Sequence, residues 1–255
     1  MPSTGTRDAV NVGLLSTIQD PLLPHFLFYA LQYGVTGLAV ICDRKQLSER
    51  DQRIIAQRTD GALRSLEGQA ADVYRFGRHR VPFYFVDSHN GEDTIDLIAE
   101  LGLQYLLNAG TPRRISSRVL SSVPAGIINV HPGVLPQYRG CSCVEWAILN
   151  DDPVGNTAHF MDEGYDTGPI IASETYQFAP FCTYTALRTT VYLKGCELAA
   201  RVLRQLQDGT LTAAGAVAQP PEAGRYWDPL PDTRLVEVEA KLAGNHYQFQ
   251  LREPV

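Results

Sequence analysis

The feature that most constrains the fold is a series of short apolar runs separated by segments whose apolar residues have helical spacing. The apolar runs lie at residues 10–15, 37–42, 81–86, 104–107 and 126–130, and the helical segments lie at residues 21–33, 47–66 and 92–101. Strands that alternate with helices in this way predict βαβ units and a parallel sheet. Because runs such as 37–42 are apolar throughout, the sheet should be covered on both faces. We therefore predict an α/β fold with a mostly parallel sheet flanked by helices.

The pattern of the chain changes after residue 131. Residues 144–149 and 185–206 have helical spacing, residues 157–161 and 170–176 are expected strands, and two prolines at 220–221 interrupt the chain. Beyond these prolines, residues 235–238 and 246–251 are expected to be strands of a small tail. We predict a main domain at residues 1–210 and a small C-terminal extension at residues 211–255.

The composition argues against several classes of protein. The formal charge of −6 disfavours a nucleic-acid partner, which requires clustered Lys and Arg. No apolar run approaches the roughly 20 residues that span a bilayer, and residues 1–16 lack the features of a signal peptide. The five cysteines include no CxxC pair, so we expect neither a disulfide framework nor a metal site. We expect a cytoplasmic protein with no membrane or nucleic-acid partner.

Two polar side chains, Asn129 and His131, stand at the end of an expected strand. Open parallel sheets place their ligand sites at the carboxyl ends of strands, and residues two apart in a strand share a face. Both side chains could therefore point into one crevice. An amide can donate to a developing oxyanion, and an imidazole can donate to it or move a proton near neutral pH. The alternative is that both merely cap the turn that follows.

A carboxylate, Asp166, lies in a Gly-x-Asp-x-Gly-Pro turn between two expected strands. It could orient a histidine or accept a proton through water, or it could simply bond the turn's own amides. His159 in the preceding strand is expected to support the site or to be a buried core histidine. The GxGxxG, GxxxxGK[ST], GxSxG and HExxH motifs do not occur in the chain.

With these residues in view, the chain resembles the folate-dependent formyltransferase family, which includes glycinamide ribonucleotide and methionyl-tRNA formyltransferases. Residues 129–136 resemble its N-x-H-P-S-L-L-P segment, residues 166–170 its D-x-G-x-I turn, and residues 157–160 its T-V-H-F strand. Residues 108–115 look like its folate-lining loop. The resemblance implies a Rossmann-like catalytic domain at residues 1–210. Gly133 stands where the family usually has Ser, and we expect little consequence from this departure.

The resemblance also implies the site residues and the cofactor. Asn129, His131 and Asp166 would be catalytic, and no metal would be needed. The formyl donor would be 10-formyltetrahydrofolate. Its pterin would be held largely by backbone groups, and the implied cofactor-binding residues are Arg113, Ile115, Asp162, Glu163, Tyr165 and Asp166.

The acceptor implied by the resemblance is a small-molecule amine. Residues 16–20 replace the family's Gly-rich phosphate loop, which disfavours glycinamide ribonucleotide, and the non-basic tail disfavours tRNA. The length is closest to that of sugar N-formyltransferases, so a nucleotide-linked amino sugar is favoured over a hydroxyornithine-type siderophore precursor. A 10-formyltetrahydrofolate hydrolase and a non-catalytic folate-binding protein are the alternatives from other classes. A homodimer is also left open.

Overall fold

The structure is a computed structural model that describes residues 11–65, 73–76, 79–220 and 222–251, with the backbone alone at 73–76 and 79. Most of the segment used for the signal-peptide prediction lies outside these residues. The strands are β1 (Asn11–Ser16), β2 (Leu38–Asp43), β3 (Val73–Phe76), β4 (His79–Val86), β5 (Leu103–Asn108), β6 (Ile127–His131), β7 (Tyr138–Gly140), β8 (Gly155–Phe160), β9 (Ile170–Thr175) and β10 (Arg225–Trp227). The α-helices are α1 (Leu23–Gln32), α2 (Glu49–Thr59), α3 (Glu92–Glu100), α4 (Ser117–Ser122), α5 (Cys143–Leu149), α6 (Tyr184–Asp208) and α7 (Asp232–Ala243).

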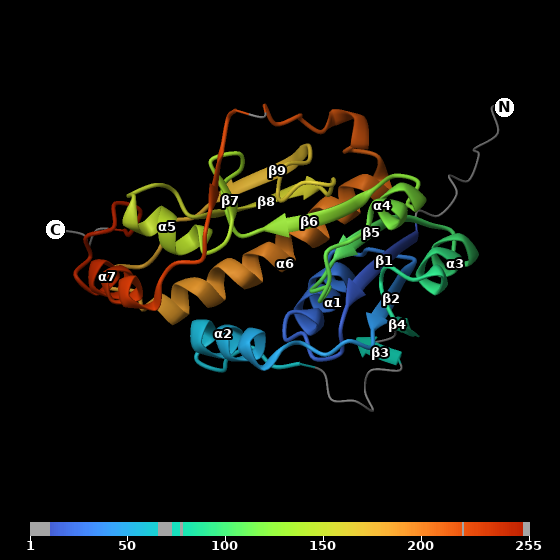
Figure 1. The fold of residues 1–255 in the computed structure, drawn as a ribbon, viewed down its shortest axis with the longest axis horizontal. Helices are drawn as coiled ribbons and strands as arrows, with labels where there is room; N and C mark the ends of the chain where they lie inside the picture. The colour runs from blue at the N-terminus through green and yellow to red at the C-terminus, as the bar shows by residue number, and fades with distance from the viewer. Residues whose placement is uncertain (1–10, 66–72, 77–78, 221, 252–255) are drawn as a thin grey trace.

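An eight-stranded sheet in the order β3-β4-β2-β1-β5-β6-β8-β9 forms the centre of the molecule (Figure 1). The strands from β4 to β6 are parallel to one another, whereas β3, β8 and β9 are antiparallel to the neighbour each pairs with. The predicted α/β fold with a mostly parallel sheet is confirmed. The order reverses at β1, where β2 lies on one side and β5 on the other, so ligands are expected at the carboxyl ends of β1, β5 and β6.

Helices cover both faces of this sheet because successive strand residues point to opposite sides. Leu14 packs in a core formed with α1 and α6, whereas its neighbour Leu15 packs in a core formed with α3 and α4. The long α6 crosses under the sheet in Figure 1 and reaches from the α1 side to the α5 side. No helix in the described part of the chain is both long and apolar enough to cross a bilayer.

The segment after α6 does not have the strands predicted for it. Residues 235–238 lie inside α7, and residues 246–251 form no strand apart from one bridge between Gln250 and Phe178. The prediction failed because Val238 and Leu242, four residues apart, share a helix face that is fully buried. They pack in one core with residues of α5, so α7 is anchored against α5.

The loop between β1 and α1 places a buried carboxyl group at the point where the strand order reverses. Asp20 is 5% exposed, and its Oδ1 accepts a hydrogen bond of 2.8 Å from the Leu22 N–H. Burial raises the pKa of Asp20 to about 6, although the backbone N–H donors oppose this. Gly110, with φ +99°, allows the close approach, because a Cβ there would lie 2.0 Å from Asp20 Oδ2.

Candidate functional site

Asn129 is held in one orientation by a chain of hydrogen bonds from the end of β5. Asn108 Oδ1 accepts the Gly110 and Thr111 N–H groups at 3.2 and 3.0 Å. Its Nδ2 therefore donates to Asn129 Oδ1 at 2.9 Å. Asn129 Nδ2 then points away from β5 and lies 3.1 Å from His159 Nε2. Since an amide nitrogen carries two hydrogens, one remains to bind another group.

His131 lies in the same strand but is nearly enclosed. Its Nε2 lies 2.8 Å from the Tyr138 carbonyl oxygen and must therefore carry a proton. Its Nδ1 lies 3.4 Å from Asp166 Oδ2. Burial lowers the pKa of His131, and the charge of Asp166 opposes that shift. His131 therefore has one ring nitrogen engaged with the backbone and the other directed at a carboxylate.

Asp166 joins the two histidines. Its Oδ2 accepts the Gly140 N–H at 2.9 Å, and its Oδ1 lies 3.5 Å from His159 Nε2. Burial alone would raise the pKa of Asp166, but His131, His159 and the Gly140 N–H outweigh it and lower the pKa to about 2. Asp166 is thus a carboxylate at neutral pH, with a positive φ of 56° that suits its turn.

These groups border a cavity of about 270 Å³, which we call the site cavity. Its lining residues are Asn108, Arg113, Arg114, Ile115, Asn129, His159, Met161, Asp162, Gly164, Tyr165 and Asp166. All the residues predicted for the site are among them except His131 and Glu163. The Glu163 side chain is exposed, and its carbonyl oxygen accepts a hydrogen bond from Arg114 Nη2. The sequence predicted that His131 shares a crevice with Asn129. Instead, the His131 ring contacts the Tyr138 carbonyl and Asp166 and does not line the site cavity.

The residues present fit a pterin ring. Ile115 is 4% exposed and Met161 supplies a second apolar wall. In the described part of the chain, neither the N–H nor the carbonyl of Ile115 makes a hydrogen bond, nor does the Arg113 carbonyl. Buried backbone groups without partners are costly, and the edge of a pterin carries both donors and acceptors. The Arg114 guanidinium lies 4.9 Å above the Tyr165 ring at the rim of the site cavity.

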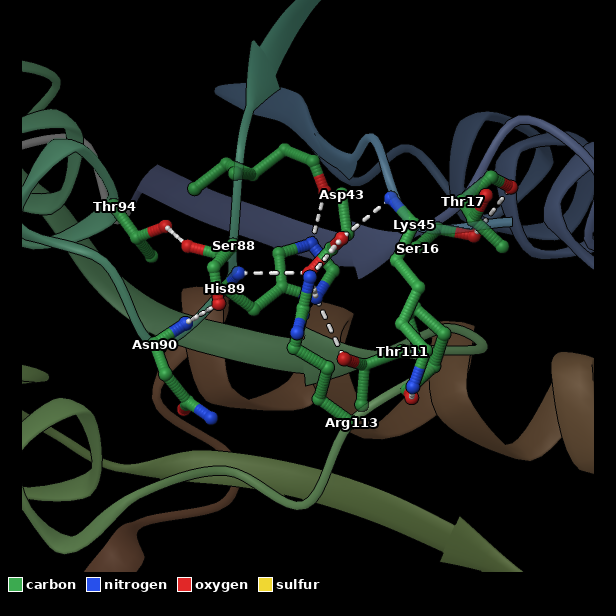
Figure 2. Close-up of polar contacts among 12 residues, drawn as sticks. Ser16, Thr17, Asp43, Lys45, Ser88, His89, Asn90, Thr94, Thr111 and Arg113 are labelled. Carbon is green, nitrogen blue, oxygen red and sulfur yellow. Dashed lines mark hydrogen bonds and ion pairs between the residues drawn. The ribbon is translucent and has the colours of Figure 1, made fainter. Parts of the chain in front are cut away.

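Arg113 is fixed by a buried network of residues that no sequence motif predicts. Figure 2 shows its guanidinium beside the Asp43 carboxylate, with Nη2 3.0 Å from Oδ1. Asp43 also accepts the His89 N–H at 2.8 Å, and the His89 ring bonds Thr111 Oγ1 at 2.6 Å. Burial lowers the pKa of His89. The Arg113 side chain is therefore held by the ends of β2 and β4, and the Arg113 backbone remains for the site cavity.

Gly133 matters more than the sequence indicated. A Cβ at this position would lie 2.7 Å from His131 Nε2 and 2.7 Å from the Tyr138 carbonyl oxygen. Any side chain there would intrude between the two atoms that form the His131 hydrogen bond. The absence of a side chain at 133 thus permits the observed orientation of the His131 ring.

Over much of its length this chain is similar to known formyltransferases. A family model described as "Formyl transferase" matches residues 30–203. The methionyl-tRNA formyltransferase of Agathobacter rectalis is 38% identical over 97 residues, which cover 38% of this chain and 31% of that protein. The enzyme of the same name from Parvibaculum lavamentivorans is 31% identical over 167 residues, 65% of this chain and 53% of that protein. The chain thus matches about a third to a half of the length of these curated relatives.

Solved structures share the fold at low identity. Glycinamide ribonucleotide transformylase 1 from Symbiobacterium toebii has a TM-score of 0.59 and 20% identity, covering 86% of this chain and all (100%) of that one. An N-formyltransferase from Helicobacter canadensis, in complex with folinic acid and dTDP-3-aminofucose, has a TM-score of 0.56 and 18% identity, covering 86% and 70%. Among the described residues, no group of three or more His, Cys, Asp or Glu side chains is placed to hold a metal ion.

Proposed function

The chain belongs to the formyl transferase family, and from this premise we propose that it is an N-formyltransferase that moves a formyl group from 10-formyltetrahydrofolate to a small-molecule amine. The observation that carries the proposal is the convergence of Asn129, His159 and Asp166 on a cavity bordered by free backbone groups. The folate supplies the formyl carbon and, when bound, its N10 as the leaving group. Ile115 and the Arg113 backbone would hold the pterin.

Asn129 is the donor best placed to stabilise the formyl oxygen. Its Oδ1 is engaged by Asn108, so the remaining Nδ2 hydrogen is available to negative charge developing on that oxygen. Because the orientation is fixed before the reaction, no reorganisation is required when the charge develops. Removing one such donor typically lowers the rate by about 10²–10³-fold.

The proton that the amine loses is the second requirement. The amine nitrogen bonds to the formyl carbon as the bond to the folate nitrogen breaks, and one proton passes from the amine to that nitrogen. A carboxylate with a pKa of about 2 is too weak a base to remove the proton alone. We assign the transfer to Asp166 and His131 together: Asp166 borders the site cavity and receives the proton, and His131 Nδ1, which lies 3.4 Å from Asp166 Oδ2, shares it. General acid–base catalysis of this kind contributes about 10²–10⁴-fold.

The acceptor we favour is a nucleotide-linked amino sugar. The Helicobacter canadensis enzyme, whose structure contains dTDP-3-aminofucose, has the same fold over 86% of this chain. A hydroxyornithine-type amine is the second candidate. The polar groups of the site cavity are assigned to the folate and its formyl group, so they do not distinguish between the two acceptors.

The test uses purified enzyme, 10-formyltetrahydrofolate and a panel of amines. Asn129→Ala, His131→Ala and Asp166→Ala are expected to reduce turnover by about 10²-fold or more. Glu100→Gln is the matched control, because this carboxylate is exposed at the end of α3 and does not line the site cavity. Near-normal turnover in any two of the three alanine variants would refute the assignment. Rapid formate release without an amine would favour a hydrolase, and folate binding without turnover would favour a binding protein.

A further inference from the structure

A second cavity borders the residues that hold Asp166 and His131. It has a volume of about 500 Å³, and its walls include Pro132, Gly140, Cys141, Cys143, Arg58 and Arg188. We call it the arginine cavity. Pro132 directly follows His131, and the Gly140 N–H is the group that binds Asp166 Oδ2. A molecule in the arginine cavity would therefore lie against the same backbone that positions the catalytic carboxylate.

Two guanidinium groups line this cavity, and one carboxylate, that of Glu145, lies behind them; the three side chains come from three different helices. Arg188 of α6 and Glu145 of α5 are each 2% exposed, and the Arg58 side chain of α2 is 25% exposed. Glu145 Oε1 lies 3.6 Å from the Nε of each arginine and accepts the Tyr184 hydroxyl at 2.5 Å. A single carboxylate thus faces two cations, which leaves a surplus of positive charge.

The hydrogen bonding of this cluster is also incomplete. Arg188 Nη2 donates to the Tyr192 hydroxyl at 2.7 Å. Within the part of the chain that the structure describes, Arg188 Nε and Glu145 Oε2 are buried without a hydrogen-bond partner. Burying a charge without full pairing is costly, and a single carboxylate does not offset the desolvation of two arginines. A ligand that brings its own negative charge would remove this imbalance.

The charge of the arginine cavity is opposite to that of the chain. The chain carries a formal charge of −6, yet the charged side chains that line this cavity are three arginines, Arg50, Arg58 and Arg188, and one aspartate, Asp51, which is exposed. Guanidinium groups bind carboxylates and phosphates through paired N–H donors. The alternative is that the cluster only holds α2, α5 and α6 together. In that case substitution of Arg58 would lower the urea midpoint and leave KM for the acceptor unchanged.

We infer that the amine acceptor carries an anionic group, a carboxylate or a phosphate, which binds Arg58 and Arg188 in the arginine cavity while the amine faces Asp166. This inference rests on the proposed function. The inference limits the acceptor to amines that also carry a negative charge. This charge must be far enough from the reacting nitrogen to bind the arginines while the nitrogen faces Asp166. Neutral amines would lack the contact that anchors them.

The kinetic test compares Arg58→Gln with Arg53→Gln. Arg53 lies on the same helix, is exposed and lines neither cavity, so it controls for the loss of a charge on α2. We expect Arg58→Gln to raise KM for the acceptor about 10–100-fold, with KM for 10-formyltetrahydrofolate and the urea midpoint unchanged. Arg58→Lys should restore part of the loss. An unchanged acceptor KM, or a raised folate KM instead, would overturn the inference.

The substrate panel distinguishes the two sources of the anion. It pairs an α-amino acid carrying a side-chain amine with its methyl ester, and a nucleotide-linked amino sugar with the free amino sugar. Preference for the acid identifies a carboxylate, and preference for the nucleotide-linked sugar identifies a phosphate. Equal turnover of both members in each pair would overturn the inference.

A binding measurement keeps the inference independent of turnover. Calorimetric titration with inorganic phosphate and with acetate is carried out on the wild type, Arg58→Gln and Arg53→Gln, with folinic acid as a probe of the site cavity. Anion binding that is lost only in Arg58→Gln supports the arginine cavity even if no amine is formylated. Absence of anion binding in a wild type that binds folinic acid refutes it and leaves the formyl transfer proposal standing.

Discussion

Asp20→Asn should stabilise the protein at neutral pH and above. Asp20 has a pKa of about 6 against an ordinary value of 3.8, because burial disfavours its charged form. This difference corresponds to a cost of up to about 3 kcal/mol once the carboxyl group is ionised. Asn has nearly the same shape, and its oxygen can still accept the Leu22 N–H that Asp20 Oδ1 accepts at 2.8 Å.

The pH dependence of this effect has a definite sign. A raised pKa in the folded state means that the stability contribution of Asp20 is fully present below pH 3.8 and is lost as the pH rises through about 6. Linkage therefore gives the Asn variant an advantage of about 1.6 kcal/mol at pH 5 that grows to about 3 kcal/mol at pH 8. The positive end of the α1 dipole favours the Asp20 carboxylate and therefore reduces the stability advantage of the Asn variant at both pH values.

Urea denaturation at pH 5, 6, 7 and 8, followed by tryptophan fluorescence, measures this difference directly. Asp96→Asn is the control, because Asp96 is an exposed carboxylate on the surface of α3. The reasoning is refuted if Asp20→Asn is no more stable than the wild type at pH 8, or if its advantage does not change between pH 5 and pH 8.

Three further substitutions have expected outcomes. Asp166→Asn should lower the free energy of unfolding at pH 7 by up to about 2.4 kcal/mol, as measured by urea denaturation. The lowered Asp166 pKa of about 2 stabilises the fold above pH 3.8, and this stabilisation is lost as the pH falls towards 2. Equal stability of the variant and the wild type at pH 7 would contradict this. Gly133→Ala should lower kcat about 10–100-fold in formyl transfer without weakening folinic acid binding, because its Cβ would displace the His131 ring; unchanged kcat would show that the ring adapts. Asn108→Ala frees the Asn129 amide to rotate, and we expect about a tenfold loss of kcat in formyl transfer; an unchanged kcat would show that Asn129 keeps its orientation without Asn108.

The element pattern was readable from the sequence because it is local. Alternating apolar runs and helical spacing predicted the sheet, and α6 was expected at residues 185–206 within a helix observed at Tyr184–Asp208. The tail was misread because 235–238 is too short a segment to distinguish strand from helix by its apolar residues alone. Only the burial of Val238 and Leu242 against α5 decides between them.

The residues close together in the sequence were the part of the candidate site that the sequence predicted. Asn129 and His131 at a strand end, and Asp166 in a rigid turn, were recognisable because each motif is contiguous. The contact of His159 with Asn129 is different, since it depends on the antiparallel register that pairs these two residues across β6 and β8. Register is set by the packing of whole strands, and no short segment specifies it.

Helix placement decided the remainder. Arg58, Glu145 and Arg188 are far apart in the sequence and lie on three helices, so nothing local marks them as one cluster. The same holds for Asp43, which binds Arg113, and for His89, whose N–H donates to Asp43; they come together because parallel strands end at one edge of the sheet. The sequence by itself identified the motifs that resemble the formyltransferase family and support the proposed formyl transfer, since each of these motifs is contiguous. The tertiary structure alone placed the charges that we infer select the acceptor, because charge pairs between elements exist only once the layers have packed.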